Sequence, residues 1–330
     1  MNGMINVTAQ SQPKRHETLA ASGLRLALIT PARNEEQFIE LTLRSVIAQN
    51  VRPIRWIIVN DGSTDRTGEI VARYAMEHDW MEYVALPARA GRHFAAKVEA
   101  FNHGYRLLGK IQFDVIGSLD GDISLDDPEY FAFLIDQFDR DPVLGVTGTP
   151  FTEDGKTYDY RFTNSAHVSG ACQLFRKECF AAIGGYRALP MGCVDLVAVT
   201  TARMMGWKTQ SFFDKTSTHH KKSQSFAYMT IAQAFRSGYV DYLIGGDLMW
   251  QALRAVNQMR RPRLALRGIA LFFGFLWACI TRVRKPVSKQ FVHFRRQEQR
   301  LRLFNLFRRM WYSKRKDAKH TRWVSLDRRG

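Results

Sequence analysis

Cysteine is scarce in this chain, which has four among 330 residues. No two cysteines form a Cys-x-x-Cys pair, and no group of cysteines and histidines has the spacing of zinc ligands. The sequence therefore predicts neither a disulfide framework nor a structural zinc site, and a reducing, cytosolic compartment is expected. The first 23 residues are polar and lack the apolar core of a secretory signal, so we expect a flexible leader over 1–23.

Long apolar runs are also missing. The longest uncharged one, residues 268–281, has fourteen residues between Arg267 and Arg282. A membrane-spanning helix needs about 20. This run therefore predicts a helix that is re-entrant, interfacial or buried.

Two familiar phosphate-binding motifs are absent. No segment matches Gly-x-x-x-x-Gly-Lys-Ser/Thr, the P-loop. The first predicted strand is followed by TPARNEE, where a dinucleotide-binding domain would carry Gly-x-Gly-x-x-Gly. These absences argue against kinase, GTPase and dehydrogenase functions.

Negative charge is rare in the last part of the chain. The formal net charge is +17, but residues 251–330 contain 22 Lys and Arg against three Asp and Glu. The rest of the chain is close to neutral. The C-terminal part should therefore meet an anionic partner, either lipid headgroups or nucleic acid.

Apolar runs typical of strands alternate with helical patterns in the first half. The expected strands are 24–31, 54–60, 81–87, 113–119 and 143–150, and the expected helices are 35–49, 65–79, 92–108 and 128–140. This alternation predicts an α/β fold with a mostly parallel sheet and helices on both faces. Further on, 168–175 is interpreted as a turn of small residues before a helix near 176–183. A helix over 195–206 and a strand over 207–213 follow, and the pattern is helical and basic from about 224.

Three polar clusters come directly after expected strands: PARNEE (31–36), NDGSTD (60–65) and DGD (120–122). Ligands of open parallel sheets bind beyond the carboxyl ends of the strands. Paired carboxylates such as Asp120 and Asp122 suit Mg²⁺ or Mn²⁺, which would neutralise a departing diphosphate. Asp61 would hydrogen-bond a nucleobase or ribose. The clusters together predict a site for a nucleotide whose diphosphate leaves.

The ordered motifs PARNEE, IIVNDGSTDRT, SLDGD, SGACQLFRKECFAAIGGY and VDLVAVTTARMMGWKT resemble a family-2 glycosyltransferase of the GT-A fold. The resemblance extends over about 24–222. It implies a Rossmann-like nucleotide-diphospho-sugar transferase domain over 24–222. It also implies transfer with inversion from a nucleotide-sugar, a UDP-sugar being favoured, to a lipid-linked or glycan acceptor, with Mg²⁺ or Mn²⁺ as cofactor.

The same resemblance assigns site residues. It implies that Pro31, Ala32 and Glu35 line the nucleoside pocket, that Asp61 contacts the base, that Lys97 lies near the phosphates, and that Asp120, Asp122 and His219 are metal or diphosphate contacts, with Asp122 the direct metal ligand. Two positions depart from the family pattern, because Asn60-Asp61 replaces an Asp-Asp pair and Val194-Asp195 replaces a Glu-Asp pair. The alternative for the pair His219-His220 is an exposed basic loop.

The second departure leaves two candidates for the catalytic base. The family's base lies eleven residues before a Gly-aromatic turn, and Asp195 lies eleven residues before Gly206, which Trp207 follows. Alignment on the Asp-Leu pair would instead place Cys193 there. A thiol is poorly matched to removing a proton from a sugar hydroxyl, so Asp195 is predicted as the base. Its alternative role is a helix N-cap.

The basic C-terminal part predicts a membrane contact. The apolar run lies between basic segments, and Phe294, Leu301, Phe304 and Phe307 stand among arginines. This combination is typical of helices in the plane of an anionic membrane. We therefore expect residues 223–330 to form a helical, basic extension, peripheral or monotopic at the cytoplasmic side of the inner membrane. The alternative is a basic appendage that packs on the body of the enzyme.

Two rival functions fit less of the sequence. A nucleotidyltransferase on a similar sheet would carry a Gly-rich loop with Lys or Arg directly after the first strand, and PARNEE lacks it. A nucleic-acid-binding protein would explain the basic extension but not the three carboxylate clusters. Nucleic acid is therefore not expected as a partner.

Overall fold

The computed structural model describes residues 23–88, 95–157, 165–221, 230–260 and 265–326, with side chains up to residue 308. The chain divides into two compact units, an N-terminal unit (1–188 and 207–221) and a C-terminal unit (189–206 and 222–330). This division differs from the expected domain 24–222 in one segment, because 189–206 belongs with the C-terminal helices. The expected leader lies outside the described residues, apart from Gly23.

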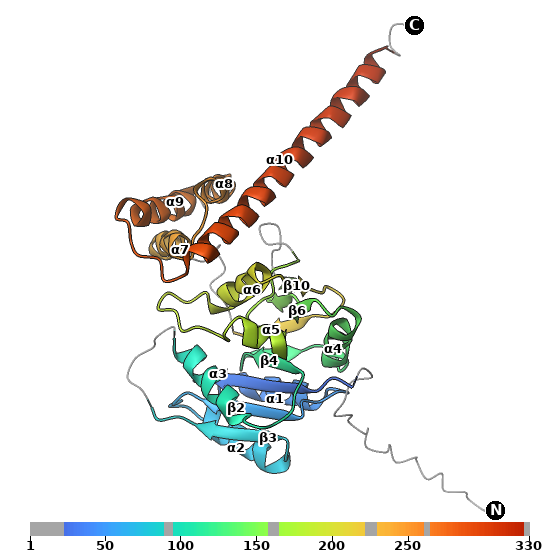
Figure 1. The fold of residues 1–330 in the computed structure, drawn as a ribbon, viewed down its shortest axis with the longest axis vertical. Coiled ribbons are helices and arrows are strands. Elements are labelled where there is room, and N and C mark those ends of the chain that lie inside the picture. The colour runs from blue at the N-terminus through green and yellow to red at the C-terminus, as the bar shows by residue number, and fades with distance from the viewer. Residues whose placement is uncertain (1–22, 89–94, 158–164, 222–229, 261–264, 327–330) are drawn as a thin grey trace, which may run out of the picture. The chain divides into compact units, whose positions relative to one another are not determined.

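A seven-stranded sheet forms the centre of the N-terminal unit (Figure 1). Its strand order is β10-β6-β9-β4-β1-β2-β3. Its strands are β1 (Leu26–Ala32), β2 (Arg55–Asn60), β3 (Met81–Ala85), β4 (Val115–Leu119), β6 (Leu144–Gly148), β9 (Cys172–Arg176) and β10 (Lys208–Ser211). Every neighbouring pair is parallel except the two that involve β9. The predicted α/β class, with its mainly parallel sheet, is confirmed.

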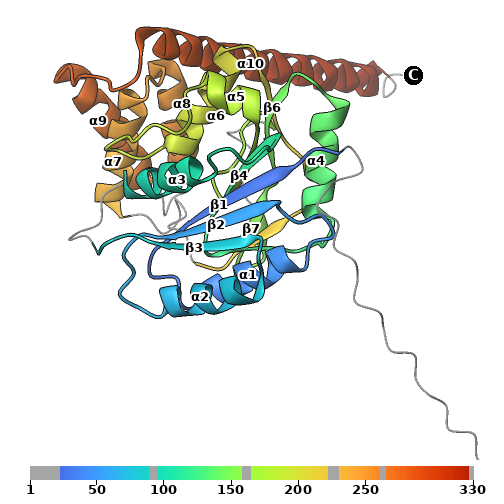
Figure 2. The same ribbon diagram turned by 60° about the horizontal axis from the view of Figure 1, so that its bottom comes forward.

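Helices cover both faces of this sheet (Figure 2). Helices α1 (Ile39–Ile47), α2 (Thr67–Glu77) and α4 (Tyr130–Arg140) share one core with Leu26 and Leu28 of β1. Helix α3 (Ala96–Leu107) packs against the intervening residues, and its Gly104 approaches Ile29 and Val59 closely. Successive strand residues point to opposite faces, so β1 is buried on both sides.

Strand β9 corrects the expectation of a turn over 168–175. It is a central strand, antiparallel to both β4 and β6. Its sequence, CQLFR, is short and almost wholly buried, so it lacks the alternating pattern of a half-exposed strand. Gly117 of β4 lies opposite Leu174 of β9. The Leu174 side chain occupies the space that a Cβ on residue 117 would need, so a glycine is required there. Helix α5 (Lys177–Ala182) follows as expected.

A second, smaller sheet has the order β5-β11-β7-β8. Its strands are β5 (Ile123–Leu125), β7 (Phe151–Glu153), β8 (Lys156–Thr157) and β11 (Ser217–His219). Three residues, the Asp-Gly-Asp turn, separate β4 from β5, so this turn connects the two sheets.

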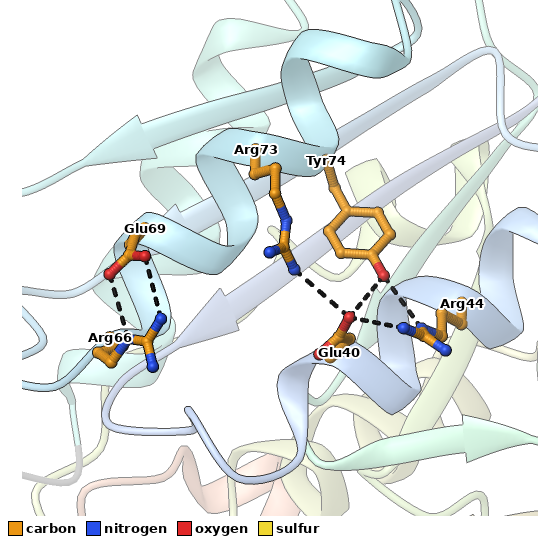
Figure 3. A network of polar contacts seen from close by, with 6 residues as sticks. All are labelled: Glu40, Arg44, Arg66, Glu69, Arg73 and Tyr74. Atoms are coloured by element: carbon orange, nitrogen blue, oxygen red, sulfur yellow. Dashed lines mark hydrogen bonds and ion pairs between the residues drawn. The ribbon is translucent and has the colours of Figure 1, made fainter.

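Helices α1 and α2 are tied by the carboxylate of Glu40 (Figure 3). Its Oε1 accepts hydrogen bonds from the Tyr74 hydroxyl (2.9 Å) and from Arg44 (2.9 Å), and Arg73 lies 3.4 Å away. These contacts hold the helices that follow β1 and β2, and hence the loops that precede them, in a fixed relation.

The C-terminal unit is helical (Figure 1). It contains α6 (Val194–Met204), α7 (Ile231–Leu243), α8 (Leu248–Met259), α9 (Ala265–Ile280) and α10 (Lys289–Leu326). Helices α7 and α9 approach closely through glycines, since a Cβ on Gly238 would lie 1.8 Å from the Leu271 carbonyl oxygen and one on Gly274 would lie 1.9 Å from the Phe235 carbonyl oxygen. Among the described residues, none of the helices combines the length and the apolar character that crossing a membrane requires.

Replacing Gly274 by Ala should destabilise this unit by about 2–3 kcal/mol, because the added methyl meets backbone that cannot rotate away. We expect a fall in Tm on the order of 5–10 °C by calorimetry. Phe273→Ala, on the exposed face of the same helix, is the matched control and should shift Tm by no more than about 2 °C. An equal Tm for wild type and Gly274→Ala would refute the close helix contact.

The first half of α10 is built into the C-terminal unit. Arg203 of α6 forms a two-pronged ion pair with Glu298 of α10, at 2.7 and 3.0 Å. The buried Arg295 guanidinium donates to Asp241 (2.7 Å) at the end of α7. Gln299 accepts from the backbone N–H of Asp247, at 2.7 Å. Residues 291–300 of the basic extension therefore link α6 to the corner between α7 and α8.

Candidate active site

The loops after β1 and β2 are joined by hydrogen bonds. The Asn34 N–H donates to the Ser63 hydroxyl (3.0 Å), and the Thr64 N–H donates back to the Asn34 side chain (2.8 Å). The Glu35 N–H donates to the Thr67 hydroxyl, at 2.8 Å. Asn34 adopts the left-handed conformation, φ 54°, that asparagine tolerates better than most residues. PARNEE and NDGSTD thus form one rigid edge.

Pro31 and Ala32 end β1, where they pair with Val59 and Asn60 of β2. The Asp61 N–H donates to the Ala32 carbonyl, at 2.8 Å. This bond continues the pairing for one residue beyond β2 and places Asp61 at the carboxyl edge of the sheet. The sequence assignment of these three residues to one edge therefore agrees with their positions.

The Asp61 side chain is almost fully buried and lies 3.5 Å from the Arg33 guanidinium. Its neighbour Asn60 has a different role, because its side-chain oxygen accepts a hydrogen bond from the Ser63 N–H at 2.9 Å. Asn60 therefore stabilises the turn, and Asp61 alone supplies a carboxylate.

Carboxylates from both sheets meet near the Asp-Gly-Asp turn. Lys97 Nζ lies 2.5 Å from Asp120 Oδ1. His219 Nε2 lies 3.3 Å from Asp122 Oδ2, and His219 Nδ1 lies 3.2 Å from Glu153 Oε2. Residues from α3, β7 and β11 thus converge on the two aspartates.

Glu35 joins this cluster from the PARNEE loop. Its Cγ lies 3.6 Å from the position a Cβ would take on Gly121, between the two aspartates. Oε1 contacts Lys221 Nζ at 2.7 Å, whereas the buried Oε2 finds no hydrogen-bond partner among the described residues. We define the acidic cluster as Glu35, Asp120, Asp122 and Glu153.

The pKa values of these groups reflect crowding of negative charge. Burial, and then the charges of Asp122 and Asp120, raise the pKa of Glu35, although Lys221 opposes the shift. Burial also raises the pKa of Asp120, in spite of Lys97. Burial alone would raise the pKa of Asp122, but the hydrogen bond from His219 lowers it below its ordinary value. The cluster requires nearby positive charge to stay ionised.

The residue types fit a hard divalent cation, since carboxylate oxygens are its preferred ligands and imidazole suits Mn²⁺. Lys97 contacts Asp120, and His219 contacts Asp122. Within the described residues, no group of three or more His, Cys, Asp or Glu side chains is arranged as a set of metal ligands. The metal roles of Asp120, Asp122 and His219 stay predictions.

Two members of the site were missed in the sequence. Glu153 is the last residue of β7, and Lys221 comes two residues after the end of β11, so both are positioned by the small sheet. The rule that singled out PARNEE, NDGSTD and DGD applies to residues directly after strands of the main sheet, and it does not reach these two positions.

The two histidines do not form an exposed loop. Both are part-buried, and a hydrogen bond of 2.8 Å joins His220 Nε2 to the Ser124 hydroxyl. Its ring stacks on Phe38, with centroids 6.0 Å apart. Hydrogen bonds with Asp122 and Glu153 raise the pKa of His219, against the effect of burial, which alone would lower it. His219 therefore points to the acidic cluster, and His220 is structural.

Asp195 lies in the first turn of α6, in the C-terminal unit. It is not the N-cap, because Cys193 holds that position with φ 60° and forms no side-chain cap. A carboxylate in a first helical turn is stabilised by the helix dipole. Burial raises the pKa of the Cys193 thiol to about 11, so it stays protonated near neutral pH. Cys193 is thereby a poor base.

Comparisons with known proteins identify the family of the N-terminal part of the chain. Residues 27–190 match the model described as "Glycosyl transferase family 2". The chain belongs to this family through that segment.

Curated relatives share only this segment. The chain is 32% identical over 126 residues to a poly-beta-1,6-N-acetyl-D-glucosamine synthase of Staphylococcus epidermidis, covering 38% of this chain and 28% of that protein. It is 35% identical over 119 residues to the synthase of the same name from Staphylococcus aureus (strain COL). This match covers 36% of this chain and 26% of that protein. The aligned segment spans less than a third of each relative's own length.

Solved structures share the fold. A mannosyltransferase from Pyrobaculum calidifontis, in complex with GDP-Man and Mn²⁺, has a TM-score of 0.53 at 18% identity, covering 92% of this chain and 87% of that one. Residues 1–349 of S. aureus TarS, in complex with UDP, have a TM-score of 0.52 at 13% identity. The match covers 81% of this chain and 95% of that one. The GT-A fold expected from the sequence is therefore confirmed.

Proposed function

We propose that this chain transfers a sugar from a nucleotide-diphosphate sugar, with a UDP-sugar as the favoured donor, to a lipid-linked or glycan acceptor with inversion. The observation that carries the proposal is the convergence of the acidic cluster with Lys97 and Lys221, at the carboxyl edge of the sheet that also carries Asp61. One solved structure of the same fold holds GDP-Man and Mn²⁺, and another holds UDP. Both are consistent with a nucleotide donor here.

The residues have distinct roles in this reaction. Pro31, Ala32 and Glu35 would border the nucleoside, and the Asp61 carboxylate would accept hydrogen bonds from the base or ribose. Lys97 and Lys221 would bind diphosphate oxygens. Asp120, Asp122 and His219 would hold Mg²⁺ or Mn²⁺, which supplies Lewis-acid stabilisation of the leaving diphosphate.

Asp195 would act as the general base. The acceptor hydroxyl oxygen attacks the anomeric carbon opposite the diphosphate, and its proton passes to Asp195. The bond between the anomeric carbon and the diphosphate oxygen breaks, and its electron pair leaves with the nucleoside diphosphate. A single displacement of this kind inverts the anomeric configuration.

Asp61→Ala tests the nucleotide site directly. Calorimetric titration with UDP in the presence of Mn²⁺ should show affinity weakened at least about tenfold, since hydrogen bonds to a charged group contribute about 1.5–3 kcal/mol. Asp79→Ala removes an exposed carboxylate of the same unit and should leave the affinity unchanged. Unchanged UDP affinity in Asp61→Ala would refute the base-contact role.

We also propose that the C-terminal unit contacts an anionic membrane at its cytoplasmic side, without crossing it. One face of α9 packs in the unit, and the other exposes Leu266, Ile269, Phe273, Trp277 and Ile280 at spacings of three and four. Phe273 and Trp277 are 59% and 57% exposed. An apolar stripe on a cationic unit is the pattern of helices lying in a membrane interface.

The double variant Phe273→Ser/Trp277→Ser should lose about tenfold or more in partitioning onto anionic liposomes, because each large apolar side chain contributes about 1.5–3 kcal/mol when buried. The matched control Met76→Ser/Val143→Ser changes exposed apolar residues of the N-terminal unit and should partition as wild type does. Tight binding of duplex DNA but not of liposomes would contradict the proposal. Deletion of 264–330 is a weaker test, since it also removes the contacts of α10 with α6.

A further inference from the structure

One face of α10 carries a cavity of about 280 Å³. It is lined by Lys289, Val292, His293, Arg296, Gln297 and Arg300. These residues recur at spacings of three and four, so they occupy one face of the helix. Phe291, Arg295 and Gln299 are buried in the C-terminal unit. Val292, at the border of the cavity, packs against Gly245.

The cavity is cationic. Three of its lining residues are Lys or Arg, one is His, and none is acidic. Arg300 Nε contacts Asp247 at 2.8 Å, and His293 hydrogen-bonds Gln297 at 2.8 Å. The buried Nε of Arg296 has no hydrogen-bond partner among the described residues. A buried, unsatisfied guanidinium N–H beside further positive charge is suited to an anion with several acceptor oxygens.

The same face becomes apolar toward the C-terminus. Phe304 and Phe307 follow Arg300 at spacings of four and three, and Leu301 borders them. These three side chains are between 53% and 61% exposed. A ligand that satisfied both parts would have an anionic head and an apolar tail.

We propose that this face of α10 is a binding site for the phosphate headgroup of a lipid, with the phosphate in the cationic cavity and the chain along Phe304 and Phe307. The site deepens the proposed function, on which it rests, by giving a lipid phosphate a defined position on the C-terminal unit. It is distinct from the exposed stripe of α9, which offers apolar area without a cavity. A phosphate oxygen accepts from the Arg296 N–H and is attracted by Lys289 and Arg300.

The test uses the full chain and decyl phosphate below its critical micelle concentration, so no membrane is needed. Calorimetry should show decyl phosphate binding at least about tenfold more tightly than inorganic phosphate or decyl maltoside. Lys289→Gln/Arg296→Gln should weaken it about 25-fold, roughly fivefold for each basic residue. The matched pair Arg260→Gln/Arg284→Gln removes two exposed charges outside the cavity and should have an effect of less than about threefold.

Phe304→Ser should weaken the binding of decyl phosphate but leave the affinity for inorganic phosphate unchanged. Equal weakening by both charge-removing pairs would overturn the proposal, because it would show diffuse attraction. Equal affinity for inorganic and decyl phosphate would also overturn it, since the site would then bind free anions. UDP titration of each variant runs in parallel: a loss of UDP binding bears on the proposed function, and a loss of decyl phosphate binding alone bears on the lipid site.

Discussion

Replacing Asp122 by Asn should lower kcat/KM for sugar transfer about 100- to 1,000-fold, because Lewis-acid stabilisation of a leaving group contributes several kcal/mol. Asp122 is the member of the acidic cluster whose pKa is lowered, through its hydrogen bond with His219, against the effect of burial. Asp122 is therefore the carboxylate of the cluster that ionises most readily, as a ligand of a divalent cation must. An amide can still accept that hydrogen bond, so the fold should persist.

The measurement has two parts. Transfer is assayed across a range of Mn²⁺ concentrations, and Mn²⁺ binding is measured separately by calorimetry. Asp126→Asn is the matched control, an exposed carboxylate four residues away that bonds Thr216 and Thr218. It should keep both transfer and Mn²⁺ binding. Wild-type turnover by Asp122→Asn at ordinary Mn²⁺ would remove Asp122 from the metal site.

Replacing Asp195 by Asn should abolish transfer to the acceptor, with a loss of about 100- to 10,000-fold in kcat, the range that general bases contribute. An amide cannot take the proton of the acceptor hydroxyl. Asp195 and the nucleotide-binding residues belong to separate units, so UDP affinity should stay at the wild-type value. The readout is therefore a split between lost kcat and retained donor binding.

Cys193→Ala provides the contrast, because Cys193 is the other candidate base. A buried thiol with a pKa of about 11 is protonated near neutral pH. Its removal should change kcat by less than about threefold, the thiol having no proton-accepting role. A larger loss in Cys193→Ala than in Asp195→Asn would transfer the base role to Cys193.

The strands of the sheet and the residues at its edge could be predicted because apolar runs and polar clusters alternate with the period of an α/β fold. Every expected strand before residue 150 is present, within one or two residues at its ends. Asp61, Asp120 and Asp122 lie at one edge of the sheet because parallel strands end their carboxyl termini on the same side. That rule requires only the order of the strands.

Contacts across the small sheet could not be predicted in this way. Glu153 and His219 meet because β7 and β11 pair, although 66 residues separate the two side chains. The pairing depends on three-residue strands, which are too short to show an alternating pattern. Strand β9 was missed for a related reason, since a short strand buried on both faces has no polar side.

The basic extension is partly structural, and its contact with a membrane stays a proposal. Its first part is structural, as the Arg203–Glu298 and Arg295–Asp241 ion pairs show. The exposed stripe of α9 takes no part in these ion pairs. Charge counting could not separate these parts, because a buried arginine and an exposed one look the same in a composition.

The central claim is tested most directly by release of nucleoside diphosphate from a panel of UDP-, GDP- and dTDP-sugars, with Mn²⁺ and with a chelator in its place. The account predicts cation-dependent release from at least one nucleotide-sugar, a UDP-sugar first, with the activity lost in the chelator and in Asp122→Asn. The account would be contradicted if the folded chain bound none of these nucleotides, with or without Mn²⁺.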